Sequence, residues 1–161
     1  MVIILGIDPG SRITGYGVIE WANHKAKYID SGCIRMDVNA TTGNRLKTIF
    51  EGLDQLIGLY QPDVLSIEQV FVHKNPQSAI KLGQARGVVM CAAALANIEI
   101  HEYTPTRIKQ TVVGNGHATK EQVQHMVEHL LKLSRKPQAD AADALAIALT
   151  HGFHGPILGV K

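Results

Sequence analysis

The stretch VIILGIDPG, residues 2–10, is a continuous apolar run that ends in an aspartate and a Pro-Gly pair. Such a run is typical of a strand buried on both faces of a sheet, and Pro-Gly stops it in a turn. Two more strand patterns follow at residues 14–21 and 27–36 after short polar connectors. Because the links are short, we predict an antiparallel meander of three strands, with Asp8 at the end of the first.

After this meander the spacing of the apolar residues changes to that of a helix over residues 41–60, and Pro62 ends it. The remaining apolar patterns predict strands and helices in alternation. They are strands at 63–69 and 98–103, a helix from Pro76 to about Ala96, and helical segments near 105–113, 120–133 and 137–150. This order predicts one α/β domain over residues 1–161. Its five-stranded mixed sheet, three strands antiparallel and then parallel ones, would carry helices on both faces.

Composition narrows the class of protein. The chain has 161 residues with 45% hydrophobic side chains, which suits one globular domain. No apolar run approaches the roughly 18 residues of a membrane span, and the N-terminus lacks the basic start of a signal peptide. The two cysteines, Cys33 and Cys91, lie far apart, so a disulfide framework is not expected. We therefore expect a cytoplasmic protein without membrane contact.

The net charge of +2 is unevenly distributed. Residues 1–69 carry 6 basic and 8 acidic side chains, whereas residues 70–136 carry 9 basic and 4 acidic ones. A basic middle segment between acidic ends suggests a polyanion as partner, although a solvated basic surface would look the same.

Four carboxylates stand where a hydrophobic core does not explain them. Asp8 and Glu68 end the two most apolar strands, and Asp140 and Asp143 lie in the first turn predicted for the last helix. There are simpler explanations for each acid. Asp8 and Glu68 could be surface acids at strand ends, and the helix dipole would stabilise Asp140 and Asp143 near the N-terminus of a helix. If all four converge, their mutual repulsion and burial require a counter-charge, and no arginine pair stands nearby. Oxygen-only ligands then indicate two divalent ions, Mg²⁺ with Mn²⁺ as a substitute, which can hydrolyse a phosphodiester.

Several ordered motifs resemble one family over nearly the whole chain. They are GIDPGSRITGYGVI at 6–19, IEQVF at 67–71, IKLGQARG at 80–87, KQTVVG at 109–114 and QADAADALAIA at 138–148. Together they resemble the RuvC family of Holliday junction resolvases. The resemblance implies a ribonuclease-H-like fold, and it implies that Asp8, Glu68, Asp140 and Asp143 are the catalytic, metal-binding carboxylates.

The resemblance also implies a function and partners. It implies a homodimer that makes paired, symmetric nicks with 5′-phosphates in four-way DNA junctions during recombination and repair, together with the RuvA–RuvB branch-migration complex. Two alternatives remain open at this point: an RNA-processing nuclease of the YqgF type with the same fold, and a non-catalytic junction-binding module.

Further residues are candidates for DNA contact. The resemblance favours Phe71 as an aromatic wedge against bases, and it places Lys109 and Lys120 near the scissile phosphate. Thr119 and Gln122 are expected to cap the helix that Lys120 begins. The other candidates for contacts to the DNA backbone are Arg12, Lys74, Arg86 and Arg107. A loop anchor for Phe71 and a solvated surface for the cations are the structural alternatives.

Two patterns have simpler explanations. His125-Met-Val-Glu128-His129 matches an inverted zinc-protease motif, but the apolar face of its helix puts these polar residues toward solvent. Ala79, Gly83 and Gly87 form a ridge of small residues, which predicts either close helix packing within the chain or a dimer contact.

Overall fold

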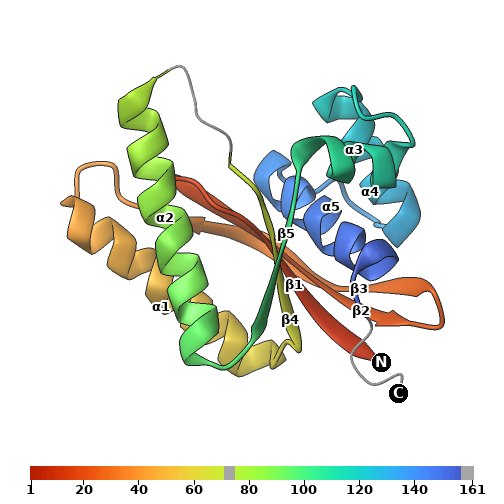
Figure 1. Cartoon of the computed structure of the whole chain (residues 1–161), viewed down its shortest axis with the longest axis horizontal. Coiled ribbons are helices and arrows are strands. Elements are labelled where there is room, and N and C mark those ends of the chain that lie inside the picture. The colour runs from red at the N-terminus through yellow and green to blue at the C-terminus, as the bar shows by residue number, and fades with distance from the viewer. Residues whose placement is uncertain (71–74, 157–161) are drawn as a thin grey trace.

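The computed structural model describes residues 1–70 and 75–156, in which one sheet separates two groups of helices (Figure 1). The strands are β1 (Val2–Asp8), β2 (Ile13–Ala22), β3 (Lys25–Arg35), β4 (Val64–Glu68) and β5 (Glu99–Tyr103). The helices are α1 (Thr42–Tyr60), α2 (Pro76–Leu95), α3 (Pro105–Val113), α4 (Lys120–Leu131) and α5 (Ala139–His154). The predicted elements are all present, with boundaries shifted by a few residues.

The five strands form a mixed sheet in the order β3-β2-β1-β4-β5. β1, β2 and β3 pair antiparallel, whereas β4 pairs parallel with both β1 and β5. Ile7 lies opposite Ile67 in the β1–β4 register. The next residues of these two strands, Asp8 and Glu68, therefore emerge side by side at one edge of the sheet. The prediction of a mixed α/β sheet is confirmed.

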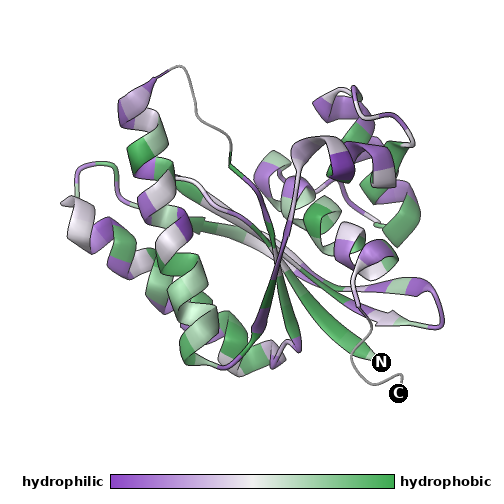
Figure 2. Cartoon of the chain, viewed as in Figure 1, coloured by the Kyte–Doolittle hydropathy of each residue, from purple (hydrophilic) through white to green (hydrophobic). Residues whose placement is uncertain are grey.

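Helices cover both faces of the sheet, as predicted. α1 and α2 pack on one face around Leu53, Leu65 and Val89, while α3, α4 and α5 pack on the other around Val127 and Leu145. Figure 2 shows β1 coloured hydrophobic along most of its length, as expected for a central strand between two layers. None of the described helices is both long and apolar enough to cross a membrane.

Glycines in β1 and β2 allow α5 to lie directly on the sheet. A Cβ atom on Gly6 would overlap the carbonyl oxygen of Ala144, and one on Gly15 would overlap that of Asp140. A side chain on Gly17, which pairs with Gly6, would meet Leu145. Glycine inside a strand marks such close backbone approach. This contact fixes the start of α5 against the end of β1.

The start of α5 differs in one respect from the sequence-based prediction. Gln138 is the N-cap residue, so Asp140 lies in the first turn of the helix and Asp143 follows in the next turn. The prediction that both acids occupy the first turn is wrong for Asp143. The spacing of three residues nevertheless keeps both acids on one side of the helix.

Candidate active site

The acidic residues predicted from the sequence come together at the sheet edge where β1 and β4 end. Carboxylate oxygens of Asp8, Asp140 and Asp143 lie within 4.8 Å of one another. Glu68 lies outside this closest group, but it lines a hollow of about 260 Å³ together with Asp8 and Asp143. We call these four carboxylates the acidic site.

Burial and like charge raise the pKa values of the acidic site. The pKa of Asp8 is raised to about 8, first by burial and then by the charges of Asp143, Glu68 and Asp140. Burial is also the main cause that raises the pKa of Glu68 and of Asp143. The protein therefore holds several carboxylates where their charged forms are unfavourable without a counter-charge.

Two lysines face the same hollow. Lys120 Nζ lies 3.4 Å from Asp143 Oδ2, and this negative charge raises the pKa of Lys120. Lys109 lines the hollow from α3, and its charge offsets part of the rise in the pKa of Glu68. Lys120 begins α4 directly after its N-cap Thr119, which forms the predicted capping box with Gln122.

The acidic site fits divalent cations. Among the described residues, Lys120 is the one cation that forms an ion pair with a carboxylate of the acidic site. Its side chain is 70% exposed, so water screens its charge well. Negative charge therefore remains in excess. Carboxylate oxygens are the ligands that Mg²⁺ and Mn²⁺ prefer, and the set includes no cysteine or histidine that would favour zinc. The chemistry of the donors thus supports the metal prediction.

Two arginines hold the segments that carry the acids, and sequence reasoning did not find this role. Arg86 Nε donates to the carbonyl oxygen of Glu68 at 3.3 Å, and its guanidinium also pairs with Glu102. Arg45 donates to the carbonyl oxygen of Ser11, just after Asp8. Because Arg86 is engaged in these contacts, they indicate a positioning role, while its predicted DNA contact stays a prediction. In the sequence Arg86 stood out only as a basic residue of the motif IKLGQARG, which does not reveal a partner 18 residues away.

The remaining candidates are distributed around the acidic site or lie outside the described residues. Arg12 is exposed in the loop after β1, and Arg107 is exposed on α3. Phe71 and Lys74 fall outside the described residues. On α4, His125 and His129 are exposed while Val123 is buried, which confirms that the protease-like motif lies on the polar side of that helix.

Comparisons with known proteins agree with this geometry. Residues 4–151 match the family model of the crossover junction endodeoxyribonuclease RuvC. A protein of this name from Hydrogenovibrio crunogenus is 64% identical over 92% of this chain and 86% of its own length. One from Pseudoalteromonas atlantica is 60% identical over 94% of this chain and 87% of its own length.

Solved structures support the same assignment. Thermus thermophilus RuvC in complex with a Holliday junction substrate superimposes with a TM-score of 0.89 at 33% identity, covering 95% of this chain and 94% of that one. The yeast mitochondrial resolvase Ydc2, at 13% identity and a TM-score of 0.67, covering 92% of this chain and 77% of that one, shares the fold.

The fold and the acidic site define a nuclease of the ribonuclease-H-like class. Within that class, the chain belongs to the crossover junction endodeoxyribonuclease RuvC family. The predictions of an enzyme and of this family are therefore confirmed. The family's description, a crossover junction endodeoxyribonuclease, supports a DNA-cutting enzyme over the two alternatives that the sequence left open.

Proposed function

We propose that this chain cuts four-way DNA junctions by hydrolysing phosphodiester bonds at the acidic site. The observation that supports this most strongly is the convergence of these carboxylates from three distant segments of the chain. Asp8, Asp140 and Asp143 lie within 4.8 Å of one another, and Glu68 lines a hollow together with Asp8 and Asp143. The high identity to named junction endonucleases supports the choice of substrate.

In this proposal the four carboxylates hold two divalent cations, Mg²⁺ in the cell with Mn²⁺ as a substitute. When bound, such ions lower the pKa of water and stabilise the departing 3′ oxygen of a phosphodiester. Asp8 ends β1 opposite Gly15, whose backbone lies directly against Asp140 at the start of α5. Its high pKa without metal means that it must release a proton before it can act as a ligand.

Lys109 and Lys120 bind the scissile phosphate in this proposal. Both line the hollow that contains Asp8 and Glu68, so their ammonium groups face the space where a phosphate would enter. Ammonium groups there neutralise charge on the phosphate oxygens as it builds up during hydrolysis. Lys120 also offsets the charge of Asp143, from which it is 3.4 Å away.

We propose a homodimer that makes two symmetric nicks with 5′-phosphates, because a four-way junction offers two equivalent strands. Gly83 and Gly87 on α2 meet nothing within 4 Å where a Cβ would stand. These two glycines of the ridge are thus not used for close packing within the described part of the chain, and a second copy can approach them. The proposal also includes the RuvA–RuvB complex as partner and the cytoplasm as location.

Cleavage of matched substrates tests the proposed function. A labelled four-way junction, a linear duplex of the same sequence and a structured RNA are each incubated with the protein and Mg²⁺. We expect paired nicks in the junction, ligatable ends, and little cleavage of the duplex or the RNA. A preference for the RNA, or equal cleavage of the duplex, would contradict the proposal.

A further inference from the structure

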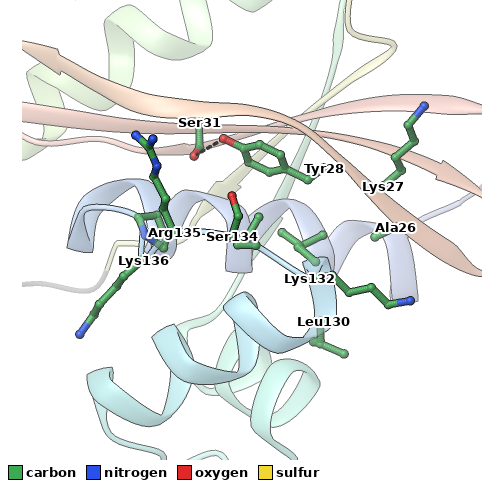
Figure 3. A pocket seen from close by; sticks show the side chains of 12 residues that line it. Ala26, Lys27, Tyr28, Ser31, Leu130, Lys132, Ser134, Arg135 and Lys136 are labelled. Carbon is green, nitrogen blue, oxygen red and sulfur yellow. Dashed lines mark hydrogen bonds between the residues drawn. The ribbon is translucent and has the colours of Figure 1, made fainter.

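A second hollow, larger than the acidic one, lies between β3 and the segment that joins α4 to α5 (Figure 3). Its volume is about 590 Å³. We call it the β3–α4 groove, and its lining consists of Ala26, Lys27, Tyr28, Ser31 and residues 130–137. Neither the catalytic proposal nor the sequence motifs assign it a role.

The β3–α4 groove is strongly basic. Lys27, Lys132, Arg135 and Lys136 line it, and all four are exposed. No acidic residue lines it, and none of these four cations forms an ion pair within residues 1–70 and 75–156. In the view of Figure 3, Lys27 and Lys132 lie toward one end of the groove and Arg135 and Lys136 toward the other. The arrangement matches an extended anion rather than a single small one.

Two walls of the groove lie on regular elements, the end of α4 and the strand β3. Lys132 caps α4 in the left-handed conformation with φ of 51°, and the N–H of Leu133 donates to the carbonyl oxygen of Glu128 at 3.0 Å. Opposite this segment, the hydroxyl groups of Tyr28 and Ser31 lie within hydrogen-bond distance at 3.0 Å. The first contact holds the backbone beside Lys132, and the second joins two side chains of the opposite wall, which lowers the entropic cost of binding a ligand.

The groove continues toward the acidic site. A neighbouring hollow of about 260 Å³ shares Ser31 and Pro137 with it and also contains Arg35 and Gln138. Arg35 Nη2 donates to Gln138 Oε1 at 2.8 Å, and Gln138 is the N-cap of the helix that carries Asp140. A basic path therefore leads from the start of α5 to the far end of α4.

We propose that the β3–α4 groove binds the sugar-phosphate backbone of one junction arm, away from the bond that is cut. This inference rests on the proposed function and extends it to a second contact region. α4 has 12 residues and so spans about 18 Å between the lysine at its start and the groove at its end. A contact there corresponds to a phosphate about five base pairs from the scissile one. The basic path to the acidic site favours DNA over an acidic protein partner.

Salt-dependent junction binding tests the proposal without cleavage. Arg135→Gln, Lys136→Gln and the double variant are compared with the wild type in EDTA at several salt concentrations. Each lost phosphate contact lowers the slope of log affinity against log salt by about 0.9, so the double variant should lose nearly twice that. Lys47→Gln, which removes one exposed charge from α1 on the other face of the sheet, is the control and should keep the slope.

Uncharged replacements of single phosphates in the DNA backbone give a second readout. Methylphosphonates at phosphates about four to seven nucleotides from the cleavage site should weaken wild-type binding. They should have little further effect on the double variant, because the same contact is already lost. An unchanged slope in the double variant, or an equal loss in Lys47→Gln, would overturn the groove proposal. A wild type that binds through the groove but cuts no junction would instead overturn the proposed function alone.

Discussion

The acidic site and the β3–α4 groove both gather side chains of like charge, but they differ in how closely these side chains are spaced and how deeply they are buried. In the acidic site, three of the four carboxylates lie within 4.8 Å of one another, and burial together with their charges raises the pKa of Asp8 to about 8. In the groove, four cations are exposed and spread over a larger surface. Crowded, buried charges are costly and therefore indicate a tightly held counter-ion, whereas exposed charges cost little. The first arrangement is suited to chemistry and the second to binding.

The largest expected effect comes from removing one carboxylate of the acidic site. Asp8→Asn should lower junction cleavage at least about a thousandfold, or about 4 kcal/mol of transition-state stabilisation, because a metal ligand is lost. Junction binding in EDTA at neutral pH should be unchanged, since Asp8 without metal is then mostly protonated and carries little charge for the substitution to remove. Single-turnover cleavage and binding measured side by side check this.

The matched control is Asp54→Asn, which removes an exposed acid from α1. Near-normal cleavage by Asp8→Asn, or an equal loss in Asp54→Asn, would contradict the distinction between buried and exposed charge.

A lysine at the edge of the acidic site should matter less than a ligand. Lys120→Gln is expected to reduce cleavage about a hundredfold, as removal of one transition-state donor does. Because the charge of Lys120 lowers the pKa of Asp143, its loss raises that pKa and moves the acidic limb of the rate profile to higher pH. A pH–rate profile measures the shift. An unshifted profile would mean that the 3.4 Å contact does not exist in the working enzyme.

The sequence predicted the carboxylates of the acidic site better than it predicted the contacts that hold them in place. Asp8 and Glu68 could be found because each ends a continuous apolar strand, and a parallel pair brings such ends together. The contacts of Arg86 and the close approach of Gly15 to α5 join segments far apart in the chain, so no local pattern reveals them. Glycines at positions 15 and 17 inside a strand were a signal for close packing, although not for its partner. The β3–α4 groove was likewise visible only as an uneven distribution of charge.

The close contact between Gly15 and the start of α5, which holds Asp140 and Asp143 in place, should tolerate no added side chain. Gly15→Ala places a Cβ against the carbonyl oxygen of Asp140, so α5 must shift or the strand must bend. We expect a loss of about 1–3 kcal/mol in unfolding free energy and weaker cleavage. Gly43→Ala on α1, where a Cβ meets nothing within 4 Å, is the control and should be neutral or slightly stabilising. Denaturant unfolding measures both. Equal stability of the two variants would show that α5 does not lie directly on β2.

The smallest expected effect concerns stability without metal. The folded protein keeps the Asp8 proton up to a pH of about 8, whereas the unfolded chain releases it near 3.8. Between these values the folded state binds more protons, so the contribution of Asp8 to stability falls as the pH rises. Asp8→Asn should therefore raise the melting temperature in EDTA at high pH by about 3 °C or more. This gain in melting temperature should vanish as the pH falls toward 3.8. A gain independent of pH would contradict the role of this carboxyl.

Calorimetric titration of Mn²⁺ into the metal-free protein tests most directly whether the four carboxylates together bind divalent cations. The wild type and Asp54→Asn should bind two ions per chain with release of protons, because Asp8 must ionise to become a ligand. Asp8→Asn should lose at least one of these ions and most of the proton release. Full binding by Asp8→Asn, or no binding by the wild type at millimolar Mn²⁺, would contradict the account.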